Sequence, residues 1–151
     1  MNKTKLTLVL ALVLSLGQVA DAQQLSKRDR LRASVQGICP ISGKKLGAHG
    51  APLKVQVGKE TVFICCKGCL KGKINPRHWA TIHANFARAQ GKCPVMKHRL
   101  PRNPKWTVVR GQIVYVCCPP CTEKIANDPD KYLRMIDEYY TSSIRDRSSS
   151  Q

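Results

Sequence analysis

The sequence predicts an α+β fold of two small units, each built from a β-hairpin, a cysteine knuckle and a helix. The first observation behind this prediction is a repeat, because two sets of four cysteines follow the same order along a chain of 151 residues. The second is an alternating segment with a central turn before each cysteine pair, which is typical of a hairpin. The third is a helix-forming segment after each knuckle. Together they indicate a duplication with a period of about 52–54 residues.

The first 22 residues have the pattern of a secretory signal peptide. Lys3 and Lys5 make the start positive, an apolar run occupies residues 6–16, and Ala20-Asp21-Ala22 is typical of a cleavage site. The apolar run is too short to span a membrane comfortably, and no second apolar stretch follows it. We therefore expect residues 1–22 to be cleaved and the remaining chain to be exported to the periplasm or secreted.

The segments on either side of the repeat are expected to lack a stable fold. Residues 23–36 are basic and mostly polar, which predicts a flexible arm or a frayed helix. The serine-rich tail, residues 141–151, is predicted to be disordered. Between these segments, the repeat divides the chain into a first metal-binding module at residues 37–90 and a second at residues 91–140.

The elements within each module follow from local patterns. In the first module, residues 53–57 alternate in polarity, residues 58–60 are turn formers, and residues 61–64 are rich in β-formers. The second module repeats this hairpin at residues 106–109, 110–112 and 113–116. A helix is predicted over residues 77–89 in the first module and over residues 130–139 in the second, where Asp128-Pro129 opens it.

The cysteines carry the strongest functional signal. Each set reads Cys-Pro, a gap of 25 or 23 residues, and then Cys-Cys-x-x-Cys. Soft thiolates bind Zn²⁺, Cu⁺ or another soft ion, and a unit this small gains needed stability from a metal. The candidate ligands are Cys39, Cys65, Cys66 and Cys69 in the first copy, and Cys93, Cys117, Cys118 and Cys121 in the second.

The vicinal cysteine pair constrains how such a site is built. Successive side chains on a strand point to opposite faces, so both members of a pair face one ion only if the strand has already turned. If three cysteines reach the ion, its coordination stays open, which suits capture or transfer. The four histidines do not occupy equivalent repeat positions, and Met96 and His98 offer a further soft ligand beside Cys93 in the second copy only.

Two other uses of the cysteines remain open at this stage. An even number of cysteines in an exported protein is compatible with a disulfide framework. Adjacent Cα atoms lie about 3.8 Å apart, below the roughly 4.4 Å that disulfides need, which disfavours a bridge within either vicinal pair. The C-x-x-C segments at residues 66–69 and 118–121 are also compatible with thiol oxidoreductase chemistry, although no βαβ context for it is evident.

The cysteine pattern also carries a resemblance to a known family. A cysteine, a long gap and a closing C-x-x-x-C (Cys65 to Cys69, Cys117 to Cys121) resembles the TRASH and YHS-like domains. The Cys-Pro-Val-Met start and the Val-Tyr-Val-Cys-Cys-x-x-Cys ending are similar to tandem YHS-like units of exported bacterial proteins, and the resemblance covers residues 37–140. It implies zinc-ribbon or treble-clef-like modules that take part in heavy-metal sensing, trafficking or resistance. The ligands it implies are Cys39, Cys65, Cys69, Cys93, Cys117 and Cys121, whereas Cys66 and Cys118 follow from the residue pattern alone.

The charge of the chain bounds its other partners. With 26 Lys and Arg against 9 Asp and Glu, the net charge is +17, which attracts an anionic envelope polymer or a membrane surface. Nucleic acid is a weaker expectation, because an exported protein is separated from nucleic acid and because aromatic residues are not interspersed in the basic segments. The charge differs between the copies after the first knuckle cysteines, where Lys67, Lys71 and Lys73 are replaced by Glu123 and Lys124. We therefore expect the two sites to differ in affinity.

No catalytic set emerges from the pattern. We find no Ser/His/Asp arrangement, paired carboxylates or phosphate-binding loop, so we expect a protein that is not an enzyme. The expected function is to hold a soft heavy-metal ion, Zn²⁺ or Cu⁺, in each cysteine module for sequestration, trafficking or resistance. The alternatives are a structural or interaction protein, stapled by zinc or disulfides, with an anion-binding surface, and a C-x-x-C thiol oxidoreductase.

Overall fold

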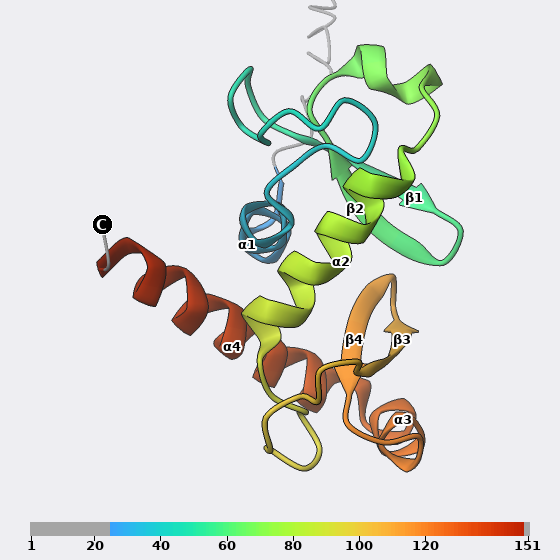
Figure 1. Cartoon of the computed structure of the whole chain (residues 1–151), viewed down its shortest axis with the longest axis vertical. Coiled ribbons are helices and arrows are strands. Elements are labelled where there is room, and N and C mark those ends of the chain that lie inside the picture. Colours follow the sequence, from blue (N-terminus) through green and yellow to red (C-terminus); the bar gives the residue numbers. More distant parts are fainter. Residues whose placement is uncertain (1–24, 150–151) are drawn as a thin grey trace, which may run out of the picture.

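The computed structural model describes residues 25–149 and confirms the α+β class. Within that range, it has two antiparallel hairpins, four α-helices and one short 3₁₀ helix. In chain order the elements are α1 (Lys27–Gln36), β1 (Leu53–Val57), β2 (Glu60–Ile64), η1 (Lys67–Lys71), α2 (Pro76–Gln90), β3 (Lys105–Val109), β4 (Gln112–Val116), α3 (Pro120–Asn127) and α4 (Pro129–Ser149). Figure 1 shows α2 in the middle of the molecule, with the hairpins on one side, α1 on the other, and α4 crossing below the end of α2.

Both predicted hairpins are confirmed, and glycine explains their tight turns. Val57 pairs with Glu60 around Gly58, whose φ is 58°. Val109 pairs with Gln112 around two residues of positive φ, Arg110 and Gly111. Such turns match the right-handed twist of the strands that they join.

The two hairpins touch each other at the second turn. The amide of Thr61 in β2 donates a hydrogen bond of 2.7 Å to the carbonyl of Gly111. A Cβ atom on Gly111 would lie 2.3 Å from Thr61 Oγ1. Position 111 therefore requires glycine for two reasons, its left-handed backbone conformation and the close approach of the neighbouring hairpin.

Of the two states predicted for residues 23–36, the helix is confirmed and the flexible arm is wrong for the described part, because residues 27–36 form helix α1. Ser26 caps the helix by accepting a hydrogen bond from the amide of Asp29 at 3.0 Å. The Asp29 carboxylate then contacts Lys54 Nζ in β1 at 3.0 Å. Arg28 pairs with Asp137 of α4 at 2.6 Å, and α1 packs against both α2 and α4. The charged residues that made this segment look solvated are the ones that attach it.

The prediction of a disordered tail at residues 141–151 is also wrong for its described part, since α4 continues to Ser149. Tyr140 is fully buried and Ile144 packs against the same core, so the helix still has a buried face beyond residue 139. Thr141 and Ser148 donate their hydroxyls to carbonyls four residues earlier, at Asp137 and Ile144. The polar side chains thus bond within the helix itself.

A buried glutamine precedes each Cys-Pro and ties a helix end to a strand. Gln36 accepts a hydrogen bond from the Phe63 amide at 2.9 Å and donates to the Phe63 carbonyl at 2.7 Å. Gln90 makes the same two bonds with Tyr115, at 2.9 and 2.7 Å. Each side-chain amide also donates to the carbonyl two residues on. The repeat therefore begins one helix earlier than the cysteines indicate, with α1 and α2 in equivalent places.

The apolar core is divided unequally between the two copies. The main cluster draws residues from α1, α2, β4, α3 and α4, and it includes Cys93 and Cys121. A separate small cluster contains Ile64 and the cysteines Cys39, Cys65 and Cys69. The first knuckle thus rests on a small core of its own, whereas the second is part of the main one.

Replacing the bridging glutamine tests how much the fold depends on it. Gln36→Met and Gln90→Met leave a backbone amide and a carbonyl buried without partners, so each is expected to lower the free energy of unfolding by about 3 kcal/mol. Urea unfolding followed by circular dichroism measures the change. The control is Gln56→Met, because Gln56 is exposed and accepts only from the Thr61 hydroxyl. Equal stability of all three variants would contradict the role of these amides.

The contact between hairpins gives a second prediction. Gly58→Ala meets only the cost of a positive φ, because nothing lies within 4 Å of its added Cβ. Gly111→Ala meets that cost and the contact with Thr61, so it is expected to destabilise by about 1–3 kcal/mol more than Gly58→Ala. Thr61→Ala in the Gly111→Ala background should recover part of the difference. No recovery in thermal unfolding would show that Thr61 is not the obstacle.

Candidate metal centres

The first cysteine of each set sits in a tight loop after a helix. The amide of Cys39 donates to the Lys44 carbonyl at 2.8 Å, and the Gly43 amide donates to the Cys39 carbonyl at 2.9 Å. Cys93 makes the equivalent bonds with His98 and Lys97, at 2.9 and 2.8 Å. An isolated β-bridge closes the base of each loop. Both cysteines are completely buried, which fixes where their sulfur atoms point.

The other three cysteines of each set follow the second strand of a hairpin. Cys65 comes directly after β2. Cys66 is the residue before η1, and Cys69 lies within η1. Cys117 comes directly after β4, and Cys121 lies in the first turn of α3. The strand has ended before each vicinal pair, which is the condition under which both sulfur atoms can approach one ion. We call Cys39, Cys65, Cys66 and Cys69 the first cluster, and Cys93, Cys117, Cys118 and Cys121 the second cluster.

In each cluster, three sulfur atoms lie mutually within 4.8 Å and could hold a metal ion. These triads are Cys39, Cys65 and Cys69, and Cys93, Cys117 and Cys121. In the first triad, Cys69 Sγ lies 3.7 Å from Cys39 Sγ and 3.6 Å from Cys65 Sγ. In the second, Cys121 Sγ lies 3.7 Å from Cys93 Sγ and 3.9 Å from Cys117 Sγ.

The fourth sulfur of each cluster stands next to its triad. Cys66 Sγ lies 3.8 Å from Cys65 Sγ and 3.9 Å from Cys69 Sγ. Cys118 Sγ lies 3.8 Å from Cys117 Sγ and 3.1 Å from Cys121 Sγ. Four sulfur atoms at 2.3 Å from a tetrahedral Zn²⁺ would be roughly 3.8 Å apart. Seven of these eight spacings are close to that edge length, but Cys66 and Cys118 do not belong to the groups whose sulfur atoms all lie within 4.8 Å of one another.

All eight cysteines are free thiols in the structure. The shortest separation between two sulfur atoms is 3.1 Å, well beyond a disulfide bond of about 2.05 Å. In this state the arrangement offers eight thiols as ligands.

The thiols of the first cluster differ in pKa because they lie close together in different surroundings. Burial raises the pKa of Cys39, but hydrogen bonds from Ser42 and from nearby backbone amides outweigh it and lower the pKa to about 6. Burial and hydrogen bonds to its sulfur neighbours raise the pKa of Cys69 to about 12. A hydrogen bond from the Cys69 amide lowers the pKa of the exposed Cys66. The sulfur atoms cannot all ionise side by side unless a cation joins them.

The second cluster shows the same division. Burial raises the pKa of Cys117 and of Cys121. Backbone hydrogen bonds outweigh burial at Cys93 and lower its pKa, and a hydrogen bond with Cys121 lowers the pKa of Cys118. Both clusters therefore favour the thiolate form at particular sulfur atoms and disfavour it at their neighbours, and a soft cation would offset that repulsion.

Side chains beside the cysteines differ in their relation to the clusters. Ser42 Oγ lies 3.3 Å from Cys65 Sγ, a contact that the sequence pattern did not reveal. Its counterpart Met96 is exposed, as is His98, and neither belongs to a triad. His83 instead lies 2.8 Å from the Tyr115 hydroxyl and 3.3 Å from Glu60. Among the described residues, no histidine takes part in a group that could hold a metal.

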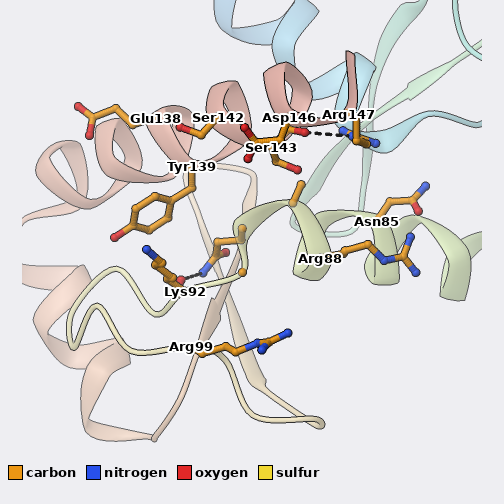
Figure 2. Close-up of a pocket in the computed structure, with 13 residues that line it drawn as sticks. Asn85, Arg88, Lys92, Arg99, Glu138, Tyr139, Ser142, Ser143, Asp146 and Arg147 are labelled. Carbon is orange, nitrogen blue, oxygen red and sulfur yellow. Dashed lines mark hydrogen bonds between the residues drawn. The ribbon is translucent and has the colours of Figure 1, made fainter. Parts of the chain in front are cut away.

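Neither of two surface cavities is lined by a cysteine. One, of about 1080 Å³, lies between the end of α2 and α4, and Figure 2 shows Arg88, Arg99 and Arg147 around it together with Glu138 and Asp146. The other, of about 610 Å³, is lined by Trp79, Trp106 and Glu60, among others. The first cavity mixes both signs of charge, so the sulfur clusters are the more specific chemical feature.

Comparison of the chain with protein-family models, with curated proteins and with solved structures gives no match. Between residues 25 and 149, no helix has both the length and the apolar character needed to cross a membrane. The predicted signal peptide at residues 1–22 lies outside the described residues. Any functional assignment must therefore come from the chemistry of the sulfur clusters.

The differences in pKa and burial among the thiols predict the order in which they are alkylated in metal-free protein. Iodoacetamide at neutral pH should modify Cys66 first, because its sulfur is exposed and its pKa is lowered. Cys69 and Cys121 should react last, because they are buried and keep their protons. Peptide mass spectrometry over time gives the order. Early modification of Cys69 would contradict the described geometry.

Proposed function

We propose that this protein binds one soft heavy-metal ion, Zn²⁺ or Cu⁺, in each of its two cysteine clusters. The observation that supports this proposal is the convergence of three sulfur atoms within 4.8 Å in each copy, with a fourth sulfur next to them. Residues that lie up to 30 positions apart are brought together in the same way twice. Thiolates are the ligands that soft ions prefer.

The role that fits such sites is sequestration, trafficking or resistance. The cysteines then act as ligands rather than as catalytic groups, and the protein is a metal carrier rather than an enzyme. The signal-peptide pattern of residues 1–22 supports an exported protein that works in the periplasm or outside the cell. The resemblance to tandem TRASH and YHS-like units favours the same role.

Metal and thiol counting test this proposal directly. Protein reduced under anaerobic conditions, loaded with Zn²⁺ and desalted should hold about two ions by mass spectrometry of the metal. After chelation it should show eight reactive thiols. Binding should release protons, because the ligands are thiolates. Loading with Cu⁺ in parallel shows which ion is held more tightly.

Single substitutions assign the ions to the clusters. Cys39→Ser and Cys93→Ser should each reduce the content to about one ion, since each removes a buried member of one triad. His98→Ala is the matched control, because His98 is exposed, follows Cys93 closely and should leave two ions bound. Circular dichroism checks that each variant is folded. A folded wild-type protein with free thiols and no retained metal would refute the proposal.

The thiol oxidoreductase alternative has its own observation, since Cys118 Sγ and Cys121 Sγ of one C-x-x-C are only 3.1 Å apart. A disulfide reductase assay separates the two functions. Turnover that Cys118→Ser abolishes, in protein that retains no metal, would favour the oxidoreductase.

A further inference from the structure

The two clusters repeat the same ligands but sit in different surroundings. Cys93 and Cys121 belong to the main apolar core, together with residues of five helices and strands. The first cluster lies in a core of four buried residues, three of which are its own cysteines. Opening the second cluster would disturb most of the protein, whereas opening the first would disturb little beyond itself.

The backbone after the vicinal pair also differs. In the second copy, Pro119-Pro120 leads into the α-helix α3, which Ile125 anchors in the main core with no exposed surface. In the first copy, Lys67 and Gly68 are the first residues of the 3₁₀ helix η1, in which Leu70 is 60% exposed. Two prolines restrict the backbone, while a glycine leaves it free to move. The knuckle that carries Cys66 is therefore the less constrained one.

The fourth cysteine of each cluster, Cys66 or Cys118, also differs in exposure between the two copies. Cys66 is exposed, and it is the only one of the eight cysteines that is. Its Sγ lies 3.9 Å from Cys69 Sγ, whereas Cys118 is half-buried with its Sγ 3.1 Å from Cys121 Sγ. An incoming ligand can reach an ion in the first cluster from the side of Cys66.

Charge selects what kind of ligand arrives there. The first knuckle carries exposed lysines at positions 67, 71 and 73, and the corresponding part of α3 has Glu123 and Lys124. The loops after the first cysteine are basic as well, with Lys44 and Lys45 in the first copy and Lys97, Arg99 and Arg102 in the second, so only the knuckle is more positive in the first copy. A positive rim raises the local concentration of anions and the rate at which they associate.

We propose that the first cluster exchanges its ion through Cys66 with an anionic thiol, while the second cluster keeps its ion as a structural centre. This inference rests on the proposed metal binding. An ion held by the first triad with Cys66 as its fourth ligand would lose its bond to Cys66 Sγ and gain one to the incoming sulfur. The proton of the incoming thiol would pass to the Cys66 sulfur, and the metal would keep its oxidation state.

Competition with small thiols tests the exchange on the full chain loaded with two equivalents of Zn²⁺. The probes are 3-mercaptopropionate, which carries a carboxylate, and neutral 2-mercaptoethanol, compared at equal thiolate concentration. Pulses of N-ethylmaleimide followed by peptide mass spectrometry show which cysteines have been released. The first cluster should open at least about tenfold faster than the second, and faster with the anionic thiol. Added salt should reduce the advantage of the anionic thiol.

Charge reversals on the two knuckles are the matched variants. Lys67→Glu with Lys71→Glu should remove the preference for the anionic thiol, and Lys124→Glu should leave it unchanged. All three lysines are exposed, so these variants are expected to fold and to retain two ions. Cys66→Ser should abolish the preference and leave the release from the second cluster unaltered.

The outcomes separate this inference from the proposed function. A protein that holds no Zn²⁺ refutes the metal binding itself. A protein that holds two ions but releases them at equal rates, or releases the second first, overturns the assignment of roles. Equal rates with both probes, or an unchanged preference in Lys67→Glu with Lys71→Glu, overturn the anionic partner.

Discussion

The hydrogen bonds of one buried glutamine in each copy set the distance between the two halves of a sulfur cluster. The first cysteine comes from a loop after a helix, and the others come from the end of a hairpin. Gln36 and Gln90 join these parts, because each side-chain amide bonds both the strand and the loop that carries the first cysteine. Both side chains are almost completely buried, so water cannot replace these bonds. The ligand geometry depends on this connection before any metal is present.

Helix α2 makes the two copies depend on each other. It follows the first knuckle, and its last residue is the glutamine that supports the second cluster. His83 in this helix lies against Glu60 of the first hairpin and Tyr115 of the second. The ring centroids of Trp79 and Trp106 lie 5.5 and 5.2 Å from that of His83. One helix thus packs against both hairpins, and neither copy has a complete set of contacts without it.

Crowded sulfur atoms would favour binding of a soft cation even though the net charge of the chain is +17. Within a cluster, some thiols are held as thiolates by backbone amides, while their neighbours keep protons because of burial and mutual repulsion. A soft ion would relieve that repulsion and replace those protons, so its binding would be coupled to the stability of the fold.

The sequence by itself determined the features that depend on neighbouring residues. The repeated cysteine spacing, both hairpins and helix α2 were predicted, because turn residues, alternation and caps act over a few positions. Helix α3 and the end of α4 were not predicted, and α1 was expected only as a frayed alternative to a flexible arm, because distant contacts stabilise these helices. For α1 the distant partners include Asp137 for Arg28 and Lys54 for Asp29. The difference in exposure between Cys66 and Cys118 likewise could not be predicted from neighbouring residues. Their local motifs match, and only packing against or away from the main core leaves one exposed and the other half-buried.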